Sequence, residues 1–389
     1  MHSSIIDSIK RSTLCHLCLA IIFFTSGLII NFGQLILYCT VRLYSKSLYR
    51  KINWYLSYSL HSQLVFLGEW WSSSKVIIYV DKEEFPKYFG KEHGYLIMNH
   101  AYEVEWLLGW IILERVKILG NAKAYCKKAI QYMPVLGWNW KFSEFVFLER
   151  NFEKDKKNIH HQVGELSDHP DPMWLVLYPE GTRFNEEKHK ASVEFARKHN
   201  QPELKYHLLP RTKGFIASLP AMRGKVPAVY DCLLVFKEDD PVEPTMRNIL
   251  MGKSVTAHLY FRRIPLEEIP ESEEGMDKFL KNLFVIKDKM KEGFLKHGDF
   301  FKYTENVPRY EPLVTERRYF TLLNTVGWSL VVLIPMISYL FKLLFSGQLV
   351  YFSIALGIIG TFFFLLQNLL SMSDIKKSSA YGTNSKKSN

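Results

Sequence analysis

Three long apolar runs stand out in the pattern of hydrophobic and polar positions along the chain. The first covers about residues 14–38 without a charged residue, and the other two lie near the C-terminus, at about residues 322–345 and 349–370. Each is long enough to cross a bilayer, which takes about 20 residues. The pattern predicts an N-terminal membrane anchor and a C-terminal transmembrane hairpin, whose turn contains Ser346-Gly347-Gln348.

Short apolar stretches alternate with amphipathic ones between these runs. They predict strands at residues 95–98, 145–148, 174–178, 228–236 and 255–261, and helices at 104–114, 156–166 and 276–295. Such alternation is typical of an α/β fold with a parallel or mixed sheet covered by helices. We therefore predict an anchor and interfacial helix in residues 1–74, a catalytic domain in 75–310, the hairpin in 311–372 and a disordered basic tail in 373–389.

Residues 52–72 are rich in aromatic side chains, among them Trp54, Tyr58 and Trp70. Aromatic rings settle at the depth of the lipid headgroups, which favours an interfacial helix. Burial of the same rings against the enzyme core fits the pattern equally well. Both interpretations stay open at this stage.

The chain is basic, with 50 Lys and Arg against 39 Asp and Glu and a formal net charge of +11. This charge suits anionic partners, although it is also what keeps many protein surfaces soluble. The sequence contains no zinc-finger spacing and no interleaved basic and aromatic motif, so we expect membrane lipids and coenzyme A rather than nucleic acid as partners.

Basic residues also flank the apolar runs and predict the orientation in the membrane. The flank after the first run is the more basic, which places it in the cytosol and the N-terminus in the lumen. Both flanks of the hairpin are basic, so the domain between the membrane segments is expected to face the cytosol. Lys386-Lys387, near the C-terminus, is similar to the dilysine signal of endoplasmic reticulum membrane proteins, but it also fits a merely lysine-rich tail.

Several chemistries find no support in the sequence. The five cysteines are scattered and do not form a disulfide framework, and Cys15-His16-Leu17-Cys18 lies in an apolar run, where small buried side chains are expected rather than a metal site. There is no Gly-x-Ser-x-Gly elbow, no His-Glu-x-x-His motif and no Walker loop.

The sharpest local feature is the segment Asn99-His100-Ala101-Tyr102-Glu103-Val104-Glu105-Trp106. A strand-like run ends at His100 and a helix-like run follows, which places the histidine at the edge of the sheet where α/β enzymes bind ligands. A carboxylate that reaches one ring nitrogen fixes the tautomer, so that the other nitrogen can act as general base. His100 and Glu105 are the candidate pair, although two such residues often lie close together without a catalytic role.

Three further blocks place cations at the ends of apolar runs. They are Phe147-Leu148-Glu149-Arg150, the turn that contains Glu180, Gly181, Thr182 and Arg183, and the turn that contains Arg211 and Lys213. Glycine permits a tight turn, and arginine offers a planar fork for phosphate. Each block alone also fits an ordinary turn or solvated strand end.

Taken in order, the four blocks resemble the glycerolipid acyltransferases, the lysophosphatidic acid acyltransferase family. Lys205-Tyr206-His207-Leu208-Leu209-Pro210-Arg211-Thr212-Lys213-Gly214-Phe215 and Ala228-Val229-Tyr230-Asp231 are most similar to the gamma and delta branch. The resemblance covers roughly residues 85–300 and implies a mixed sheet covered by helices. One position departs from the family pattern His-x4-Asp, because this chain has Glu105 where the family has aspartate.

The resemblance also implies a reaction. His100 would be the base and Glu105 its partner, Arg150 and Arg183 would bind the acceptor phosphate, Glu180, Gly181 and Thr182 would shape that pocket, and Arg211 and Lys213 would contact phosphate or coenzyme A. Lysophosphatidic acid would become phosphatidic acid in phospholipid biosynthesis, with acyl-CoA as co-substrate and no metal or other cofactor. Another acceptor, such as lysophosphatidylinositol or lysocardiolipin, and a catalytically weak lipid-binding or acyl-CoA-binding protein are the alternatives. The sequence does not identify protein partners, which stay unknown.

Overall fold

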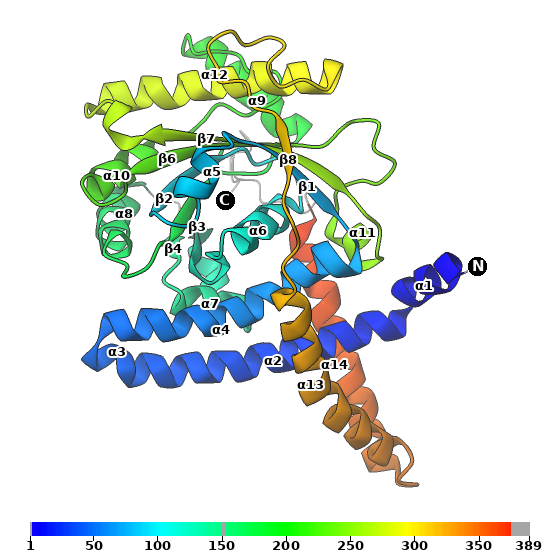
Figure 1. Cartoon of the computed structure of the whole chain (residues 1–389). Helices are drawn as coiled ribbons and strands as arrows, with labels where there is room; N and C mark the ends of the chain where they lie inside the picture. The colour runs from blue at the N-terminus through cyan, green and yellow to red at the C-terminus, as the bar shows by residue number, and fades with distance from the viewer. Residues whose placement is uncertain (1, 150–151, 375–389) are drawn as a thin grey trace, which may run out of the picture.

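A mixed sheet of eight strands forms the centre of the molecule, in the order β4-β3-β5-β2-β6-β7-β1-β8 (Figure 1). The computed structural model describes residues 2–149 and 152–374. The strands are β1 (Lys75–Tyr79), β2 (Gly94–Met98), β3 (Ala122–Lys127), β4 (Val146–Leu148), β5 (Trp174–Leu177), β6 (Ala228–Val235), β7 (Thr256–Pro265) and β8 (Pro312–Val314). β6 pairs with β7 and β1 with β8 in antiparallel register, and the other pairings are parallel. The predicted mixed α/β fold is confirmed.

Helices cover both faces of this sheet because alternate residues of its strands point to opposite sides. Leu96 and Met98 of β2 join the core beneath α6 (Glu105–Arg115), whereas Tyr95 and Ile97 join the core beneath the helices of the other face. Those helices are α8 (Phe152–Ser167), α10 (Lys213–Met222) and α12 (Glu273–His297). The remaining helices of the sheet domain are α5 (Glu84–Tyr88), α7 (Leu136–Phe142), α9 (Glu186–Lys198) and α11 (Met246–Leu250), with 3-10 turns at Leu119–Asn121, Lys128–Tyr132 and Leu266–Glu268.

The N-terminal part adds a second helical layer below α6. It consists of α1 (His2–Arg11), α2 (Thr13–Cys39), α3 (Val41–Tyr44), α4 (Lys46–Phe66) and a π-helical turn at Leu67–Trp71. The aromatic stretch from residue 52 therefore forms the end of α4 and this turn. Leu60 and Leu64 of this stretch are buried, whereas Tyr55 is 68% exposed and the rings of Trp54, Tyr58, Trp70 and Trp71 are half-buried. The stretch therefore packs on the enzyme core with its apolar positions and leaves part of its aromatic surface accessible.

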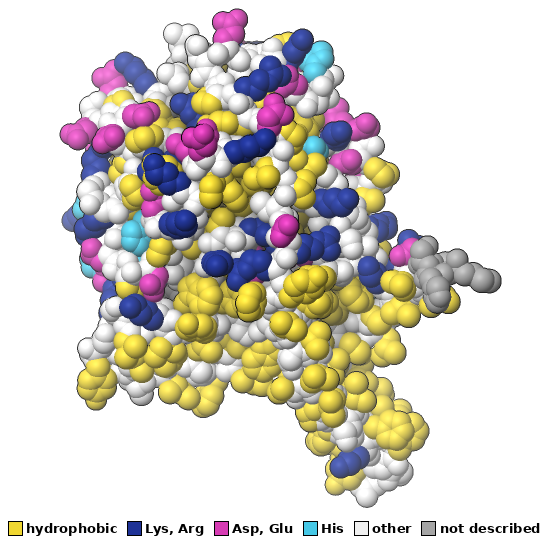
Figure 2. All heavy atoms as spheres, viewed as in Figure 1, with side chains coloured by type: hydrophobic (Ala, Val, Ile, Leu, Met, Phe, Trp, Pro, Cys, Tyr) yellow, Lys and Arg dark blue, Asp and Glu magenta, His cyan; other side chains and the backbone are white. Residues whose placement is uncertain are grey.

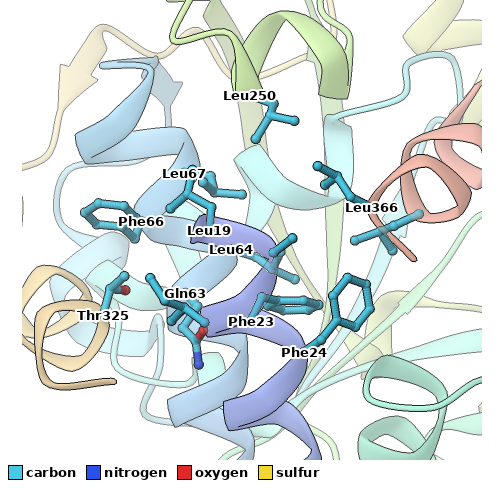
Figure 3. Close-up of a pocket in the computed structure, with 13 residues that line it drawn as sticks. Leu19, Phe23, Phe24, Gln63, Leu64, Phe66, Leu67, Leu250, Thr325 and Leu366 are labelled. Carbon is cyan, nitrogen blue, oxygen red and sulfur yellow. The ribbon is translucent and has the colours of Figure 1, made fainter. Parts of the chain in front are cut away.

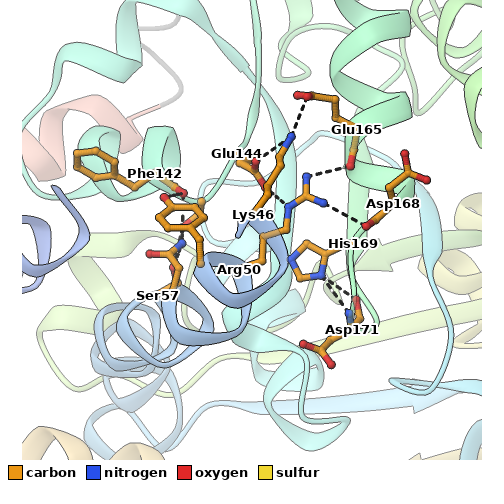
Figure 4. Close-up of polar contacts among 12 residues, drawn as sticks. Lys46, Arg50, Ser57, Phe142, Glu144, Glu165, Asp168, His169 and Asp171 are labelled. Carbon is orange, nitrogen blue, oxygen red and sulfur yellow. Dashed lines mark hydrogen bonds and ion pairs between the residues drawn. The ribbon is translucent and has the colours of Figure 1, made fainter. Parts of the chain in front are cut away.

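A buried arginine fastens α4 to the catalytic domain (Figure 4). Arg50 is 5% exposed, and its guanidinium donates to Glu144 Oε2 at 2.7 Å and to the carbonyl oxygens of Glu165 and Asp168 at 2.9 and 3.2 Å. These contacts reach both the end of α7 and the end of α8. The N-terminal helices are thus an integral part of the enzyme and not only a tether.

Both ends of α2 contact the same catalytic domain. Just before its N-terminus, the Lys10 ammonium lies 5.9 Å from the centre of the Trp71 ring, and the aliphatic part of Lys10 packs on Gly252. Toward its C-terminus, Asn31 donates to the carbonyl oxygen of Val135 at 3.2 Å, and the rings of Tyr38 and Phe142 are 5.7 Å apart. With 27 residues, α2 is about 40 Å long, and it runs beneath the sheet domain (Figure 1).

Two C-terminal helices project away from the domain, α13 (Phe320–Leu344) and α14 (Leu349–Ser373). In the described part of the chain, three helices are long and apolar enough to cross a membrane, at Thr13–Tyr44, Phe320–Leu344 and Leu349–Met372. Figure 2 shows apolar side chains gathered over the lower helices, with Lys and Arg in a band above them. The chain is therefore a membrane-associated protein.

The predicted division into residues 1–74, 75–310, 311–372 and 373–389 stays a prediction. Strand β8 lies just after residue 310, the predicted end of the catalytic domain.

Candidate active site

A side-chain clamp holds the end of β2 in place just before His100. The amide of Asn99 is fully buried; its nitrogen donates to the carbonyl oxygen of Leu234 at 3.0 Å, and its oxygen accepts from the N–H of Leu234 at 2.8 Å. The side chain thus replaces the backbone pairing to β6 where the two parallel strands end. His100 follows at the carboxyl edge of the sheet, where ligands of α/β proteins bind.

Glu105 reaches the ring of His100 from the first residue of α6. Its Oε1 is in hydrogen-bond contact with Nδ1 of His100, and its Oε2 accepts from the backbone N–H groups of Ala101 and Tyr102 at 2.9 and 3.0 Å. The carboxylate is fully buried, whereas the histidine side chain is 22% exposed. This arrangement fixes Nδ1 as the donor and leaves Nε2 to meet a substrate.

Glu103 has a different contact, although it is the closer carboxylate in sequence. Its Oε2 accepts from the N–H of Met246, at the start of α11, at 3.3 Å. The structure therefore brings Glu105 to His100 and uses Glu103 to hold a loop that follows β6.

Glu180 joins two loops to the backbone of His100. Its carboxylate accepts from the N–H of His100 at 2.7 Å through one oxygen and from the N–H of Leu208 at 2.9 Å through the other. Burial raises the pKa of Glu180 to about 8, and these two N–H donors and the Lys291 ammonium oppose that rise. Both oxygens of Glu180 therefore hold backbone segments of the site in place.

The turn after β5 packs beside the catalytic ring. The Tyr178 ring stacks on His100 with 4.4 Å between the ring centres, and the N–H of Phe184 donates to the His100 carbonyl oxygen at 2.8 Å. Gly181 has a φ of 69°, a left-handed conformation that favours glycine. Burial and the nearby Glu105 carboxylate raise the pKa of Tyr178 well above its usual range, and the half-buried Arg183 opposes that rise. The positive charge of Arg183 therefore favours the ionised form of Tyr178, whose ring stacks on His100.

The other predicted residues lie at different distances from this centre. Thr182 is buried, and its hydroxyl accepts from the ammonium of Lys188 at 2.7 Å. Arg211 is exposed, and its N–H donates to the Pro179 carbonyl oxygen at 2.7 Å. Lys213 is exposed at the start of α10, and Arg150 lies outside the described residues.

Helix α12 supplies supports that the sequence patterns did not reveal. Fully buried Lys287 bonds Asp231 at 2.7 Å and the carbonyl oxygens of Ile97 and Cys232 at 2.8 and 2.5 Å, which ties the ends of β2 and β6 together. The carboxylate of Asp288 accepts from two backbone N–H groups of the segment before Leu208, at 2.8 Å each. One signal could have revealed Lys287 in the sequence, namely a lysine within the apolar stripe of a helix. A buried ammonium needs polar partners, so such a lysine predicts contacts with other elements.

Two cavities adjoin these elements. One, of about 320 Å³, lies between Tyr102, Phe184 and Lys291 and falls in the usual size range of ligand sites. The other, of about 50 Å³, lies among apolar side chains of α2, α4 and α14 (Figure 3). It is smaller than a roughly 150 Å³ cavity that binds benzene.

Comparison with known proteins gives consistent similarities. The family model described as Acyltransferase matches residues 76–230, and the one described as Acyltransferase C-terminus matches residues 248–328. The chain is 39% identical over 384 residues to 1-acyl-sn-glycerol-3-phosphate acyltransferase delta of Bos taurus, and 40% identical over 376 residues to the gamma protein of Homo sapiens, with 96% of each chain covered. A solved structure of the 1-acyl-sn-glycerophosphate acyltransferase PlsC from Thermotoga maritima aligns at 15% identity with a TM-score of 0.40, over 72% of this chain and 94% of that one.

Proposed function

This chain belongs to the 1-acyl-sn-glycerol-3-phosphate acyltransferase family, and from that premise we propose that it converts lysophosphatidic acid to phosphatidic acid, with an acyl-CoA as the donor. The observation that carries the proposal is the pair of His100 and Glu105 at the carboxyl edge of the sheet. Glu105 contacts Nδ1 of His100, and backbone N–H groups hold the carboxylates of Glu105 and Glu180, so Nε2 of His100 is the nitrogen assigned to a substrate hydroxyl.

In the proposed reaction, Nε2 of His100 accepts the proton of the acceptor hydroxyl as that oxygen attacks the thioester carbonyl carbon. The carbon–sulfur bond then breaks, and the coenzyme A thiolate leaves and recovers the proton from His100. Glu105 stabilises the imidazolium in between. The thioester is already activated, so this route uses neither an acyl-enzyme nor a metal ion.

Four cations of the sequence blocks are assigned to the phosphates. Arg183 and Arg150 would bind the acceptor phosphate, because a guanidinium fork matches phosphate oxygens. Arg211 and Lys213, both exposed, would meet the phosphates of the acceptor or of coenzyme A. Glu180, Gly181 and Thr182 would hold the shape of the turn that carries Arg183.

A panel of acceptors tests this assignment. Membranes that contain the wild-type protein should transfer a radiolabelled acyl group from acyl-CoA to lysophosphatidic acid with a higher kcat/KM than to lysophosphatidylinositol, lysocardiolipin or monoacylglycerol. Arg183→Ala should raise KM for lysophosphatidic acid by about 10-fold or more, since charged hydrogen bonds contribute about 1.5–3 kcal/mol, and Arg183→Lys should restore only part of that loss. A higher kcat/KM for another lysolipid would assign a different acceptor.

We also propose an endoplasmic reticulum location with the catalytic domain in the cytosol and α2 lying along the membrane surface. Contact of both ends of α2 with one catalytic domain supports this arrangement, because a helix that crosses the bilayer places its ends on opposite sides. It differs from the expectation from charge alone, which put the N-terminus in the lumen. The dilysine pair Lys386-Lys387 lies outside the described residues.

An epitope tag at the N-terminus distinguishes the two arrangements. On sealed microsomes we expect external protease to remove both this tag and the catalytic domain, because both lie on the cytosolic side. A lumenal marker protein in the same vesicles controls for their integrity. Protection of the tag together with cleavage of the domain would show instead that α2 crosses the membrane.

A further inference from the structure

Helix α12 places two lysines one turn apart on its buried face, and the two differ in how well their charge is satisfied. Lys287 is fully buried and has a carboxylate and two carbonyl oxygens as partners. A buried ammonium with three acceptors is accounted for by the fold alone. The partners of Lys287 are therefore the reference with which the partners of Lys291 can be compared.

Lys291 is also buried, at 7% exposure, but its partners are weaker. Its ammonium donates to the Tyr206 carbonyl oxygen at 3.4 Å and lies 5.4 and 5.9 Å from the ring centres of Tyr102 and Phe184. Within residues 2–149 and 152–374, no carboxylate pairs with it. A buried cation without an ion-paired carboxylate carries a desolvation cost that a bound anion would offset.

Lys291 lines the cavity of about 320 Å³, together with the two rings next to its ammonium. Its walls include the rings of Tyr102, Phe184 and Phe236, and its remaining charged residues, Lys237 and Glu238, are exposed and opposite in sign. The net charge of the lining is therefore positive, and Lys291 is its buried source.

The same walls are tied to the catalytic pair. The N–H of Tyr102 donates to Glu105, and the N–H of Phe184 donates to the carbonyl oxygen of His100. The Lys291 charge also opposes the raised pKa of Glu180, which holds the backbone of His100. A ligand in this cavity would thus contact residues whose backbone is bonded to the catalytic pair.

We propose that Lys291 binds a phosphate group of a substrate within this cavity. The group is either the phosphomonoester of lysophosphatidic acid or a phosphate of coenzyme A, since both substrates carry this chemistry. The inference rests on the proposed acyl transfer and adds to it a binding residue that lies on α12, outside the four sequence blocks.

Steady-state kinetics with each substrate varied in turn test the proposal. Lys291→Met keeps the length of the side chain and its packing against the two rings but removes the charge, and we expect one KM to rise by about 10-fold or more. Lys291→Arg should restore much of that affinity. Lys289→Met, at an exposed position of the same helix, is the matched control and should leave both KM values unchanged.

The two series of measurements, one with varied lysophosphatidic acid and one with varied acyl-CoA, identify which substrate carries the bound phosphate. A rise in KM for lysophosphatidic acid alone assigns the acceptor headgroup, and a rise for acyl-CoA alone assigns the donor. Unchanged KM values in Lys291→Met, or equal loss of thermal stability and kcat without a selective change in KM, would overturn the inference. Failure of the proposed function would look different, because the wild-type protein itself would then transfer no acyl group to lysophosphatidic acid.

Discussion

Replacing His100 with alanine is expected to lower acyl transfer by about 10² to 10⁴-fold, the usual contribution of general base catalysis. Glu105 holds Nδ1 of His100 and Glu180 holds its backbone, so in the proposed reaction Nε2 is the nitrogen that takes the proton. The measurement is kcat/KM for lysophosphatidic acid in membranes that contain equal amounts of each protein.

The matched control is His160→Ala, which removes an exposed histidine of α8 far from these contacts in sequence. It should retain wild-type activity. His100→Ala should keep its membrane association and thermal stability, because the histidine side chain is partly exposed and its backbone contacts do not need the ring. Activity of His100→Ala within threefold of the wild type would remove His100 from the mechanism.

Replacing Glu105 with glutamine is expected to cost about 100-fold or more in kcat. A neutral amide cannot stabilise the imidazolium. It also cannot satisfy the His100 ring N–H and the N–H groups of Ala101 and Tyr102 together as the two carboxylate oxygens do. The effect should fall on kcat rather than on KM for either substrate, because Glu105 is fully buried behind the histidine.

Two further variants sharpen this test. Glu103→Gln removes the neighbouring carboxylate, which accepts from Met246, and should cost far less activity. Glu105→Asp restores the residue type of the family pattern but shortens an arm that makes three contacts here. Full activity of Glu105→Gln would exclude the pairing, and loss in Glu103→Gln instead would assign the role to Glu103.

Much of the sheet follows from local sequence, and the missing parts have physical reasons. β2, β4, β5 and β6 begin and end within one residue of the predicted strands because each is a largely apolar run, whereas β7 continues four residues beyond its predicted end, through Arg262 and Arg263. β3 was missed because its sequence, Ala-Lys-Ala-Tyr-Cys-Lys, has small and charged residues, and β8 because its three residues are held only by pairing with β1. β1 alternates buried and partly exposed apolar residues, a pattern that was present but too short to stand out.

Some contacts of the candidate site were likewise predictable from the sequence, and others were not. The contact between His100 and Glu105 was predictable because a strand end and a helix start bring residues five apart together. The contacts of Lys287 were not, because they join α12 to a strand 190 residues earlier, and no local pattern encodes such a distance. The basic run after α2 likewise predicted an orientation without indicating that α2 contacts one domain at both ends.

The C-terminal hairpin also connects the enzyme to the thickness of its membrane. Each helix has 25 residues and is about 37 Å long, whereas the hydrocarbon core is about 30 Å thick. A hairpin of this length that crosses a bilayer would meet the mismatch by tilting, and its tilt would change with the lipid around it. Arg318, at the base of α13, donates to the carbonyl oxygen of Glu114 at 2.6 Å. Glu114 lies near the end of α6, the helix that begins with Glu105. The angle that a bilayer imposes on the hairpin therefore acts on the helix that positions the Glu105 carboxylate.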